Sequence, residues 1–168
     1  MLDEKLVELL NDQVNKEFYS AYLYLSMANY YNEEGLSGFG NWFTIQAQEE
    51  RDHAMLFLEY LQNNGAHVEL KTVEAPKKQF KEFKDPLNES LKHERYVTAS
   101  IHNIYAAASN VKDFRTMQFL DWFVKEQGEE EKTAEDLIKK LFGQDGKGLY
   151  MLDSELASRT YSAPTLTL

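Results

Sequence analysis

The sequence contains no cysteine, and this absence excludes disulfide bonds, thiolate zinc sites and iron–sulfur clusters. Only three prolines and eight glycines occur among 168 residues, which leaves few turn-forming residues for a β-rich architecture. No apolar run reaches transmembrane length. The N-terminus, Met1 to Lys5, lacks the apolar core of a signal peptide. We therefore expect a soluble, cytoplasmic, helical protein without a membrane segment.

Positive charge is also scarce. Lys and Arg number 18 against 28 Asp and Glu, so the formal net charge at pH 7 is −10. Such a chain repels the phosphates of nucleic acid, and we expect no nucleic-acid partner. An acidic surface favours solubility or the attraction of cations, and composition alone favours the first explanation.

Long amphipathic segments dominate what is present. Apolar residues recur at helical spacing in four of them, and the chain is long enough to bury a sizeable core. We predict an all-α fold in which residues 1–168 form a single domain. The predicted helices are four long ones and a short fifth C-terminal helix, at about residues 4–32, 37–63, 86–110, 114–142 and 149–157.

Local signals set several of the predicted helix ends. Asp85, followed by Pro86, is typical of an N-cap and first helical position. Gly143 is typical of a C-cap after the fourth helix. We interpret the segment 146–148 as a hinge before the fifth helix, and we expect the tail from Ser162 onward to be disordered.

One connection is much longer than the others. The segment from Gly65 to Lys84 shows no helical pattern, and such length is unusual within a compact domain. A helix spanning residues 37–63 is roughly 40 Å long, and about 20 extended residues reach roughly 65 Å. The loop can therefore travel the whole length of a bundle. Since the other links are short, we predict two antiparallel hairpins joined by one long crossover.

Acidic residues are spaced symmetrically about the two tight turns. Glu17 lies 33 residues before Glu50, and Glu94 lies 33 residues before Gln127. The midpoints of both intervals fall beside residues where we predict turns, Gly35 and Asn110. In an antiparallel hairpin, residues equidistant from the turn face each other. Each hairpin therefore brings a carboxylate level with a second polar side chain.

These side chains follow the apolar stripes and are expected to be buried. Buried carboxylates that repel one another would destabilise the fold unless they are protonated or offset by cations. Glu50 and His53, at i and i+3, lie on one helix face and can reach the same ion, while a central carboxylate can bridge two ions. Oxygen ligands with a single imidazole favour iron or manganese over copper or zinc.

Less specific interpretations apply to the individual residues. Because 28 of 168 residues are acidic, an interval of 33 also arises by chance, and a single Glu on an apolar stripe often reaches solvent. Tyr24, two helical turns after Glu17, could hydrogen-bond a ligand, donate an electron or simply fill the core. The other three histidines are interpreted as hydrogen-bonded core residues or exposed residues: His67, His93 and His102.

At these positions the chain resembles the bacterial non-haem ferritins over essentially its whole length. The pattern Glu17, Glu50-x-x-His53, Glu94 and Gln127-x-x-Glu130 resembles their ferroxidase ligand pattern, and the segments 15–22 and 41–43 are similar to that family as well. The resemblance implies a ferritin-like four-helix bundle with one long crossover loop and a short fifth C-terminal helix.

The resemblance also implies roles for the site residues. Glu17, Glu50 and His53 would hold a first iron, and Glu50, Glu94 and Glu130 a second. Gln127 would hydrogen-bond near the dioxygen site. The family's third iron site corresponds to Glu130, shared with the second iron, together with three more acidic residues: Glu49, Glu126 and Glu129.

Departures from neighbouring families narrow the prediction. Haem-containing bacterioferritins and rubrerythrin-like proteins carry a second Glu-x-x-His on the fourth helix, where this chain has Gln127 and Glu130. Arg51 stands where the bacterioferritin haem-ligand methionine would follow Glu50. We therefore expect no haem. The fifth helix argues against the mini-ferritins, and the resemblance to ferritins implies a homo-oligomeric hollow shell of 24 subunits.

Three functions remain open from sequence. The first is iron storage and detoxification by a ferroxidase that oxidises Fe(II) to Fe(III) with dioxygen or hydrogen peroxide and deposits ferric mineral in the shell. The second is a di-iron oxidase or peroxidase that acts on another substrate without storing iron. The third is a structural or interaction bundle whose carboxylates stay protonated or solvated.

Overall fold

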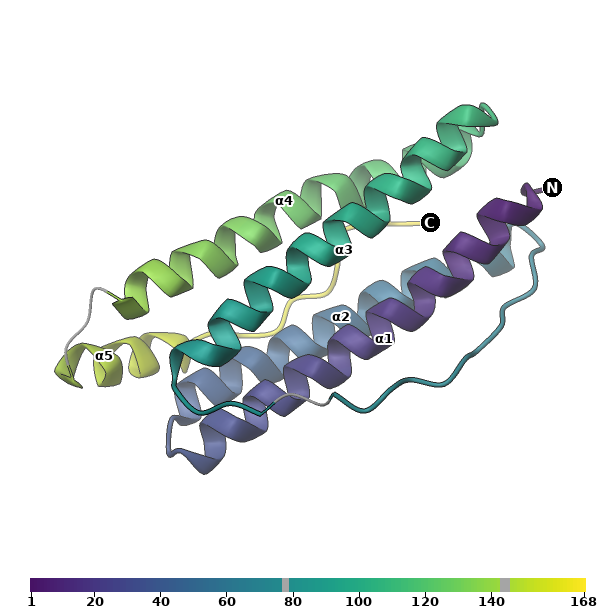
Figure 1. The fold of residues 1–168 in the computed structure, drawn as a ribbon. Coiled ribbons are helices and arrows are strands. Elements are labelled where there is room, and N and C mark those ends of the chain that lie inside the picture. Colours follow the sequence, from purple (N-terminus) through teal and green to yellow (C-terminus); the bar gives the residue numbers. More distant parts are fainter. Residues whose placement is uncertain (77–78, 143–145) are drawn as a thin grey trace.

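Helices account for most of the chain. The computed structural model describes residues 1–76, 79–142 and 146–168, and within these ranges no residue forms a strand. The five helices are α1 (Glu4–Glu33), α2 (Ser37–Asn63), α3 (Lys84–Asn110), α4 (Phe114–Phe142) and α5 (Gly146–Leu156) (Figure 1). The predicted all-α class, with four long helices and a short fifth, is confirmed. None of the described helices is both long and apolar enough to cross a membrane.

The four long helices form two antiparallel hairpins, α1 with α2 and α3 with α4 (Figure 1). α1 begins where the Asp3 carboxylate accepts a hydrogen bond from the backbone N–H of Lys5 at 2.9 Å, which satisfies a donor left free at the helix start. The first hairpin turns at Gly35, whose φ of 79° is a left-handed conformation that favours glycine. The second turns at Lys112, with φ of 56°.

The crossover from α2 to α3 runs along the outside of the bundle beside α1, as predicted (Figure 1). The Asn11 side chain of α1 holds its first part, because Nδ2 donates to the carbonyl of His67 at 3.0 Å and Oδ1 accepts from the backbone N–H of Glu69 at 2.7 Å. The Tyr31 hydroxyl donates to the carbonyl of Phe83 at 2.5 Å and holds the far end. A connection without regular structure is thus pinned at both ends of one helix.

Two apolar clusters fill the interior. The first contains Met27 and Tyr31 from the C-terminal half of α1, with Phe39 from the start of α2. The second contains Leu10 from the N-terminal half of α1, with Phe57 from the end of α2. Because the helices are antiparallel, the clusters occupy opposite ends of the bundle. The middle is left for polar side chains.

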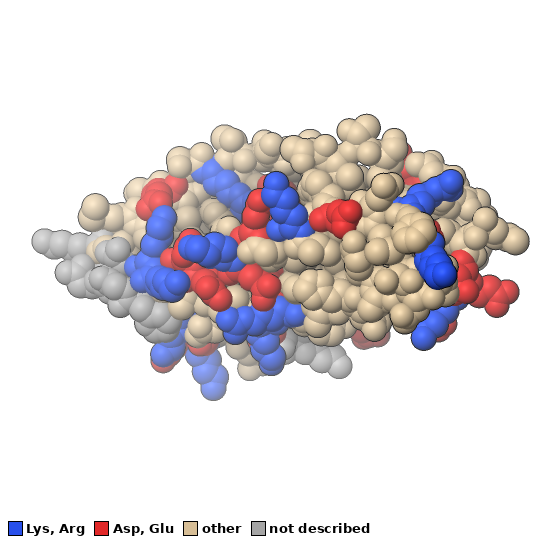
Figure 2. Space-filling view, turned by 90° about the horizontal axis from the view of Figure 1, so that it is seen from above, with Lys and Arg blue, Asp and Glu red and all other residues tan. Residues whose placement is uncertain are grey.

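The surface carries both signs of charge. On the face shown in Figure 2, basic and acidic side chains are interspersed and are separated by uncharged surface. This face is therefore not a continuous acidic patch, although the net charge of the chain is −10. Four of the acidic side chains counted in that formal charge are buried inside the bundle: Glu17, Glu50, Glu94 and Glu130.

The start of α3 differs from the prediction. The helix begins at Lys84, so Asp85 is not its N-cap. The Asp85 carboxylate instead accepts hydrogen bonds from the backbone N–H groups of Lys81 at 2.8 Å and Glu82 at 2.9 Å, and it fixes the turn that leads into the helix. Pro86 lies within the first helical turn, where its missing N–H leaves no intrahelical bond unmade.

The predicted hinge before the fifth helix is wrong. α5 begins at Gly146, so segment 146–148 is helical; the predicted C-cap, Gly143, lies outside the described residues. Leu152 and Leu156 of α5 are buried in the first apolar cluster. This packing stabilises the helix despite the low helix propensity of glycine.

The prediction of a disordered tail is also wrong. Residues 157–168 form no helix but return along the bundle (Figure 1). The Tyr161 hydroxyl donates to the Asp52 carboxylate, and the Trp122 indole N–H donates to Thr165 Oγ1 at 3.0 Å. These bonds, made to residues far away in the sequence, leave no local pattern from which order could have been predicted.

Packing between α2 and α5 yields a test. A Cβ atom at Gly38 would lie 1.7 Å from the backbone oxygen of Asp153 in α5. We expect Gly38→Ala to lower the free energy of unfolding by about 2 kcal/mol, because a backbone must move, and to lower the thermal midpoint. Gly128→Ala is the control: nothing lies within 4 Å of its added methyl, so a gain of about 0.5–1 kcal/mol is expected. Equal losses in both variants would contradict this account.

Candidate metal centre

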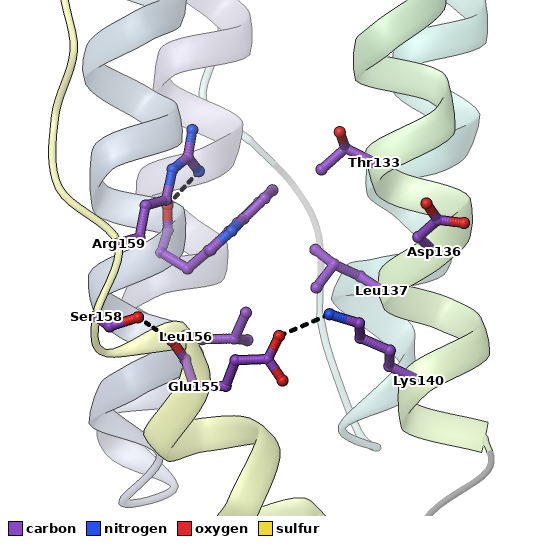
Figure 3. Close-up of a pocket in the computed structure, with 9 residues that line it drawn as sticks. Thr133, Asp136, Leu137, Lys140, Glu155, Leu156, Ser158 and Arg159 are labelled. Carbon is purple, nitrogen blue, oxygen red and sulfur yellow. Dashed lines mark hydrogen bonds and ion pairs between the residues drawn. The ribbon is translucent and has the colours of Figure 1, made fainter.

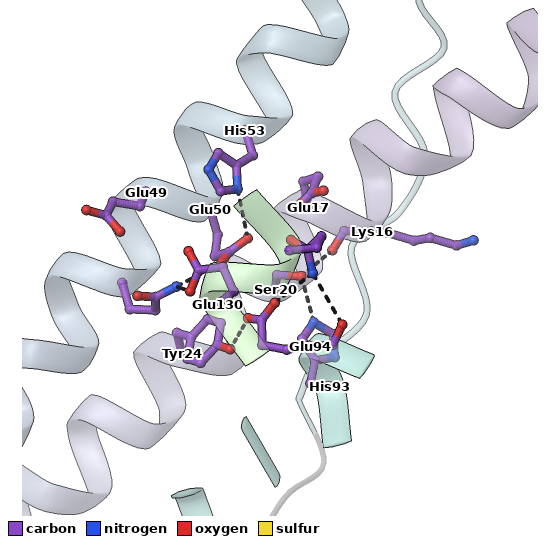
Figure 4. A network of polar contacts seen from close by, with 12 residues as sticks. Lys16, Glu17, Ser20, Tyr24, Glu49, Glu50, His53, His93, Glu94 and Glu130 are labelled. Atoms are coloured by element: carbon purple, nitrogen blue, oxygen red, sulfur yellow. Dashed lines mark hydrogen bonds and ion pairs between the residues drawn. The ribbon is translucent and has the colours of Figure 1, made fainter. Parts of the chain in front are cut away.

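Side chains from all four long helices meet between the two apolar clusters (Figure 4). Six of the predicted site residues are buried there, each exposing 9% of its surface or less: Glu17, Glu50, His53, Glu94, Gln127 and Glu130. The sequence intervals anticipated this meeting because each tight turn lies midway between the paired residues. Gln127 Nε2, for example, lies 3.0 Å from Glu94 Oε2.

The potential ligand atoms form two groups of three. One contains Glu17, Glu50 and His53, and the other contains Glu50, Glu94 and Glu130; within each group the atoms lie within 4.8 Å of one another. Glu50 belongs to both groups. Glu50 could therefore contribute to two metal ions, the first held with Glu17 and His53 and the second with Glu94 and Glu130.

Two buried side-chain atoms at the centre lack hydrogen-bond partners, as expected for atoms that bind a cation. Glu17 Oε2 and His53 Nδ1 are buried without a hydrogen-bond partner. His53 Nδ1 lies 3.3 Å from Glu50 Oε2, but it does not form a hydrogen bond with suitable geometry. The His53 ring is held edge-on to Trp122, at 5.6 Å between centroids. An unpaired imidazole nitrogen that lies close to carboxylate oxygens, one of them also unpaired, is suited to a divalent metal.

Burial makes the four carboxylates hard to ionise without a metal. Loss of solvation is the largest cause that raises the pKa of Glu17, Glu50, Glu94 and Glu130 above its ordinary range. Mutual repulsion adds to it: Glu50 raises the pKa of Glu17, and Glu94 raises the pKa of Glu50 and Glu130. A bound cation would reverse both effects by favouring the charged form.

Three glutamine amides donate hydrogen bonds to the four carboxylates. Gln127 was identified from the sequence, but Gln13 and Gln46 were missed. Gln13 Nε2 donates to Glu17 at 2.9 Å. Gln46 Nε2 donates at 3.0 Å to both Glu50 and Glu130. Gln13 and Gln46 each precede a ligand on the same helix by four residues, and that spacing was the available signal. A neutral amide orients a carboxylate without adding a positive charge that would compete with a metal.

The third amide and a phenol hold Glu94. Gln127 Nε2 donates to Glu94 Oε2 at 3.0 Å, and the Tyr24 hydroxyl donates to Glu94 Oε1. Tyr24 is buried, and loss of solvation followed by repulsion from Glu94 raises its phenolic pKa well above 10.0. The phenol therefore keeps its proton and acts as a donor in this fold. Both residues were predicted from the sequence as site residues, and in the structure both contact Glu94.

The three acidic residues assigned to a third metal site lie beside this centre. Glu49, Glu126 and Glu129, together with Glu130, line a pocket of about 320 Å³. Loss of solvation raises the pKa of Glu126, which is partly buried. The Glu49 carboxylate forms an ion pair at 2.7 Å with Arg159, a tail residue that the sequence did not bring to attention.

The remaining histidines are not part of the centre. His93 is buried and shares a 2.7 Å hydrogen bond with Ser20 Oγ (Figure 4). His67 and His102 are exposed. These positions agree with the interpretation drawn from the sequence.

Comparison with known proteins places this architecture in a family. Residues 7–142 match the ferritin family, described as the ferritin-like domain. The chain belongs to this family. It is 40% identical over 163 residues to a bacterial non-heme ferritin of Staphylococcus aureus (strain USA300), covering 96% of this chain and 98% of that one. A bacterial non-heme ferritin of Staphylococcus epidermidis is also 40% identical over 164 residues, covering 96% of this chain and 99% of that one.

Solved ferritin structures share the fold. A structure described as an engineered closed form of the Archaeoglobus fulgidus ferritin superposes with a TM-score of 0.93 at 43% identity, covering 96% of this chain and 100% of that one. A humanized archaeal ferritin gives a TM-score of 0.93 at 41% identity, covering 96% and 99%. The predicted family and the ferritin-like bundle are thereby confirmed, and membership implies iron as the bound metal.

Carboxylate burial gives the metal-free ferritin a pH dependence. Because the folded pKa of Glu17 is raised above its ordinary 4.5, the native state favours the protonated form. The contribution of protonated Glu17 to the free energy of unfolding is complete below pH 4.5 and is lost as pH rises through the folded pKa. We expect Glu17→Gln, which stays neutral, to raise the thermal midpoint of the metal-free protein at pH 7 and to flatten its fall above pH 5. Glu4→Gln, an exposed change on the same helix, is the control. A lower midpoint for Glu17→Gln at neutral pH would overturn this reading.

Proposed function

We propose that this protein stores and detoxifies iron, and that it is a ferroxidase with a di-iron centre inside each subunit. Glu17, Glu50 and His53 would bind the first Fe(II), and Glu50, Glu94 and Glu130 the second. The observation that carries the proposal is the pair of buried three-ligand groups that share Glu50. The relatives named bacterial non-heme ferritin support it.

Iron is the substrate at this centre. Two Fe(II) ions give up one electron each; one dioxygen and two protons then leave as hydrogen peroxide, or one hydrogen peroxide and two protons leave as two waters. The carboxylates favour Fe(III) over Fe(II), because the higher charge gains more from anionic ligands. Binding two ions at neighbouring sites lets a two-electron oxidant react in one encounter.

Tyr24 and Gln127 would act on the second iron through Glu94. Their O–H and N–H donors occupy different oxygens of this carboxylate, so they limit its rotation and leave lone pairs for metal. Such support of a ligand by its neighbours is a general feature of metal sites. Tyr24 is also close enough to the ligands to supply an electron when only one iron is oxidised.

The product would leave through the adjacent acidic pocket. Glu49, Glu126 and Glu129, which line that pocket with Glu130, would form a third iron position that shares Glu130 with the centre. From there Fe(III) would pass to a ferric mineral inside a hollow homo-oligomer of 24 subunits. The cage is proposed from the ferritin relatives and from α5, a segment expected at the subunit contacts around the fourfold axis.

The nature of that pocket disfavours the alternative enzyme. A di-iron oxidase or peroxidase acting on an organic substrate would need an apolar cavity beside the metals. Four of the eight residues that line the described cavity next to Glu130 are glutamates, and carboxylates attract cations rather than apolar molecules. Storage is therefore the better supported of the two. A purely structural bundle would leave Glu17 Oε2 and His53 Nδ1 buried without a role.

Removing a ligand tests the catalytic assignment. We expect His53→Ala and Glu50→Ala to lower the initial rate of Fe(II) oxidation at least about 100-fold, since even neighbours of metal ligands typically contribute 10–100-fold. Stopped-flow absorbance at two Fe(II) per subunit measures this rate, and circular dichroism checks the fold. His102→Ala, an exposed histidine, should oxidise iron at the wild-type rate. Wild-type rates in both ligand variants would exclude this centre as the site of oxidation.

The storage assignment has an independent test. We expect sedimentation velocity and electron microscopy to show a hollow particle of 24 subunits, and aerobic loading to retain far more iron than two ions per chain. A monomer or dimer that turns over an organic substrate and retains no iron would favour the di-iron oxidase instead.

A further inference from the structure

Arg159 belongs to the tail after α5, but its side chain lies against α2 (Figure 3). Its backbone carbonyl accepts a hydrogen bond from Asn41 Nδ2 at 3.1 Å. Nη1 donates to the carbonyl of Trp42 at 3.0 Å, and the guanidinium carbon lies 4.3 Å from the centre of the Trp42 ring. Both ends of the residue are thus held by the same helix. Stacking and hydrogen bonding fix the orientation of the guanidinium.

The guanidinium faces the acidic pocket next to the proposed iron centre. Nη2 donates to Glu49 Oε2 at 2.7 Å, and the side chains of both residues are about one-fifth exposed, at 21% and 20%. The lining of this pocket contains four glutamates, and among the described lining residues Arg159 is the one basic side chain. It therefore offsets a local excess of negative charge while no metal is bound there.

A single amide connects Arg159 to the centre itself. Nη2 donates to Gln46 Oε1 at 3.1 Å, and Gln46 Nε2 donates at 3.0 Å to both Glu50 and Glu130. If the Gln46 amide were reversed, its oxygen would face two carboxylates and its nitrogen would face the guanidinium. Arg159 therefore fixes which way this amide points.

We propose that Arg159 is a tethered competitor for the metal ion in the acidic pocket: it occupies Glu49 while the pocket is empty and must be displaced when an ion enters. The inference rests on the proposed function, because it assigns a role in the transfer of iron out of the centre. An ion that binds Glu49 and the neighbouring carboxylates takes the place of the guanidinium. The affinity of the pocket for the ion is lowered, because the contacts between the guanidinium and Glu49 must be broken when the ion binds.

Weak binding suits a position on a transit route. A site along such a path must attract an ion strongly enough to admit it and hold it weakly enough to release it. Four carboxylates without a fixed counter-charge would retain a cation. With Arg159 present, release of the ion is assisted by return of the guanidinium to Glu49.

Zn(II), a divalent ion that undergoes no redox reaction, provides the test. Titration of metal-free protein by calorimetry should show two tighter ions and one weaker ion per chain. We expect Arg159→Gln and Arg159→Met to bind the third ion on the order of tenfold more tightly, equivalent to about 1.4 kcal/mol. Arg159→Lys keeps a positive charge on a long side chain and should stay within about threefold of wild type.

Two further variants distinguish the loss of competition by Arg159 from an indirect effect of a less ordered tail. Tyr161→Phe removes another tail contact, to Asp52, without touching the pocket, and should leave the third affinity unchanged. Adding Glu126→Gln to Arg159→Gln should abolish the gain, which would locate the extra ion among the carboxylates of this pocket.

Unchanged or weaker binding of the third ion in Arg159→Gln and Arg159→Met would overturn the proposal. An equal gain in Arg159→Lys would overturn it as well, because charge would then not be the cause. The failure of the proposed function is measured separately, as absence of Fe(II) oxidation by wild type, and the Zn(II) titration does not depend on that reaction.

Discussion

The burial of four carboxylates in the middle of the bundle is the constraint on which the rest of the structure depends. Glu17, Glu50, Glu94 and Glu130 are buried, and loss of solvation is the largest cause that raises their pKa values; mutual repulsion adds to it for Glu17, Glu50 and Glu130. The apolar clusters on either side supply the stability that tolerates it. Such a centre is costly to the metal-free protein, and bound cations would offset that cost. The carboxylates that lower the stability of the metal-free fold are the same groups through which a bound metal would raise it.

The neighbours of the ligands follow from the same constraint. A Lys or Arg in direct contact would relieve the repulsion, but it would also occupy the place of a metal. Gln13, Gln46 and Gln127 donate to the carboxylates while remaining neutral. A positive charge lies instead at the edge of the centre, where Arg159 contacts Gln46 and Glu49. Orientation and charge compensation are thereby assigned to different side chains.

The main architecture and the convergence of the buried carboxylates could be predicted because they depend on local periodicity and on symmetry about two tight turns. Long straight helices preserve spacing, so Glu17 meets Glu50 and Glu94 meets Gln127. What the sequence did not reveal depends on contacts between distant segments. Arg159 looks like any charged tail residue until the tail is seen against α2, and Gln46 gains its importance only from the three side chains around it. The same reason applies to the start of α5, which packing extends through two glycines.

The ordered tail also has a practical consequence for handling the protein. Its last residues pack beside Tyr60 and Phe119, and Leu166 contacts the second apolar cluster. A purification tag or cargo peptide fused after Leu168 would disturb the packing of the tail, which positions Arg159. The opposite terminus, which leaves one end of the bundle next to the capping residue Asp3 (Figure 1), is the safer attachment point for affinity handles and fluorescent labels.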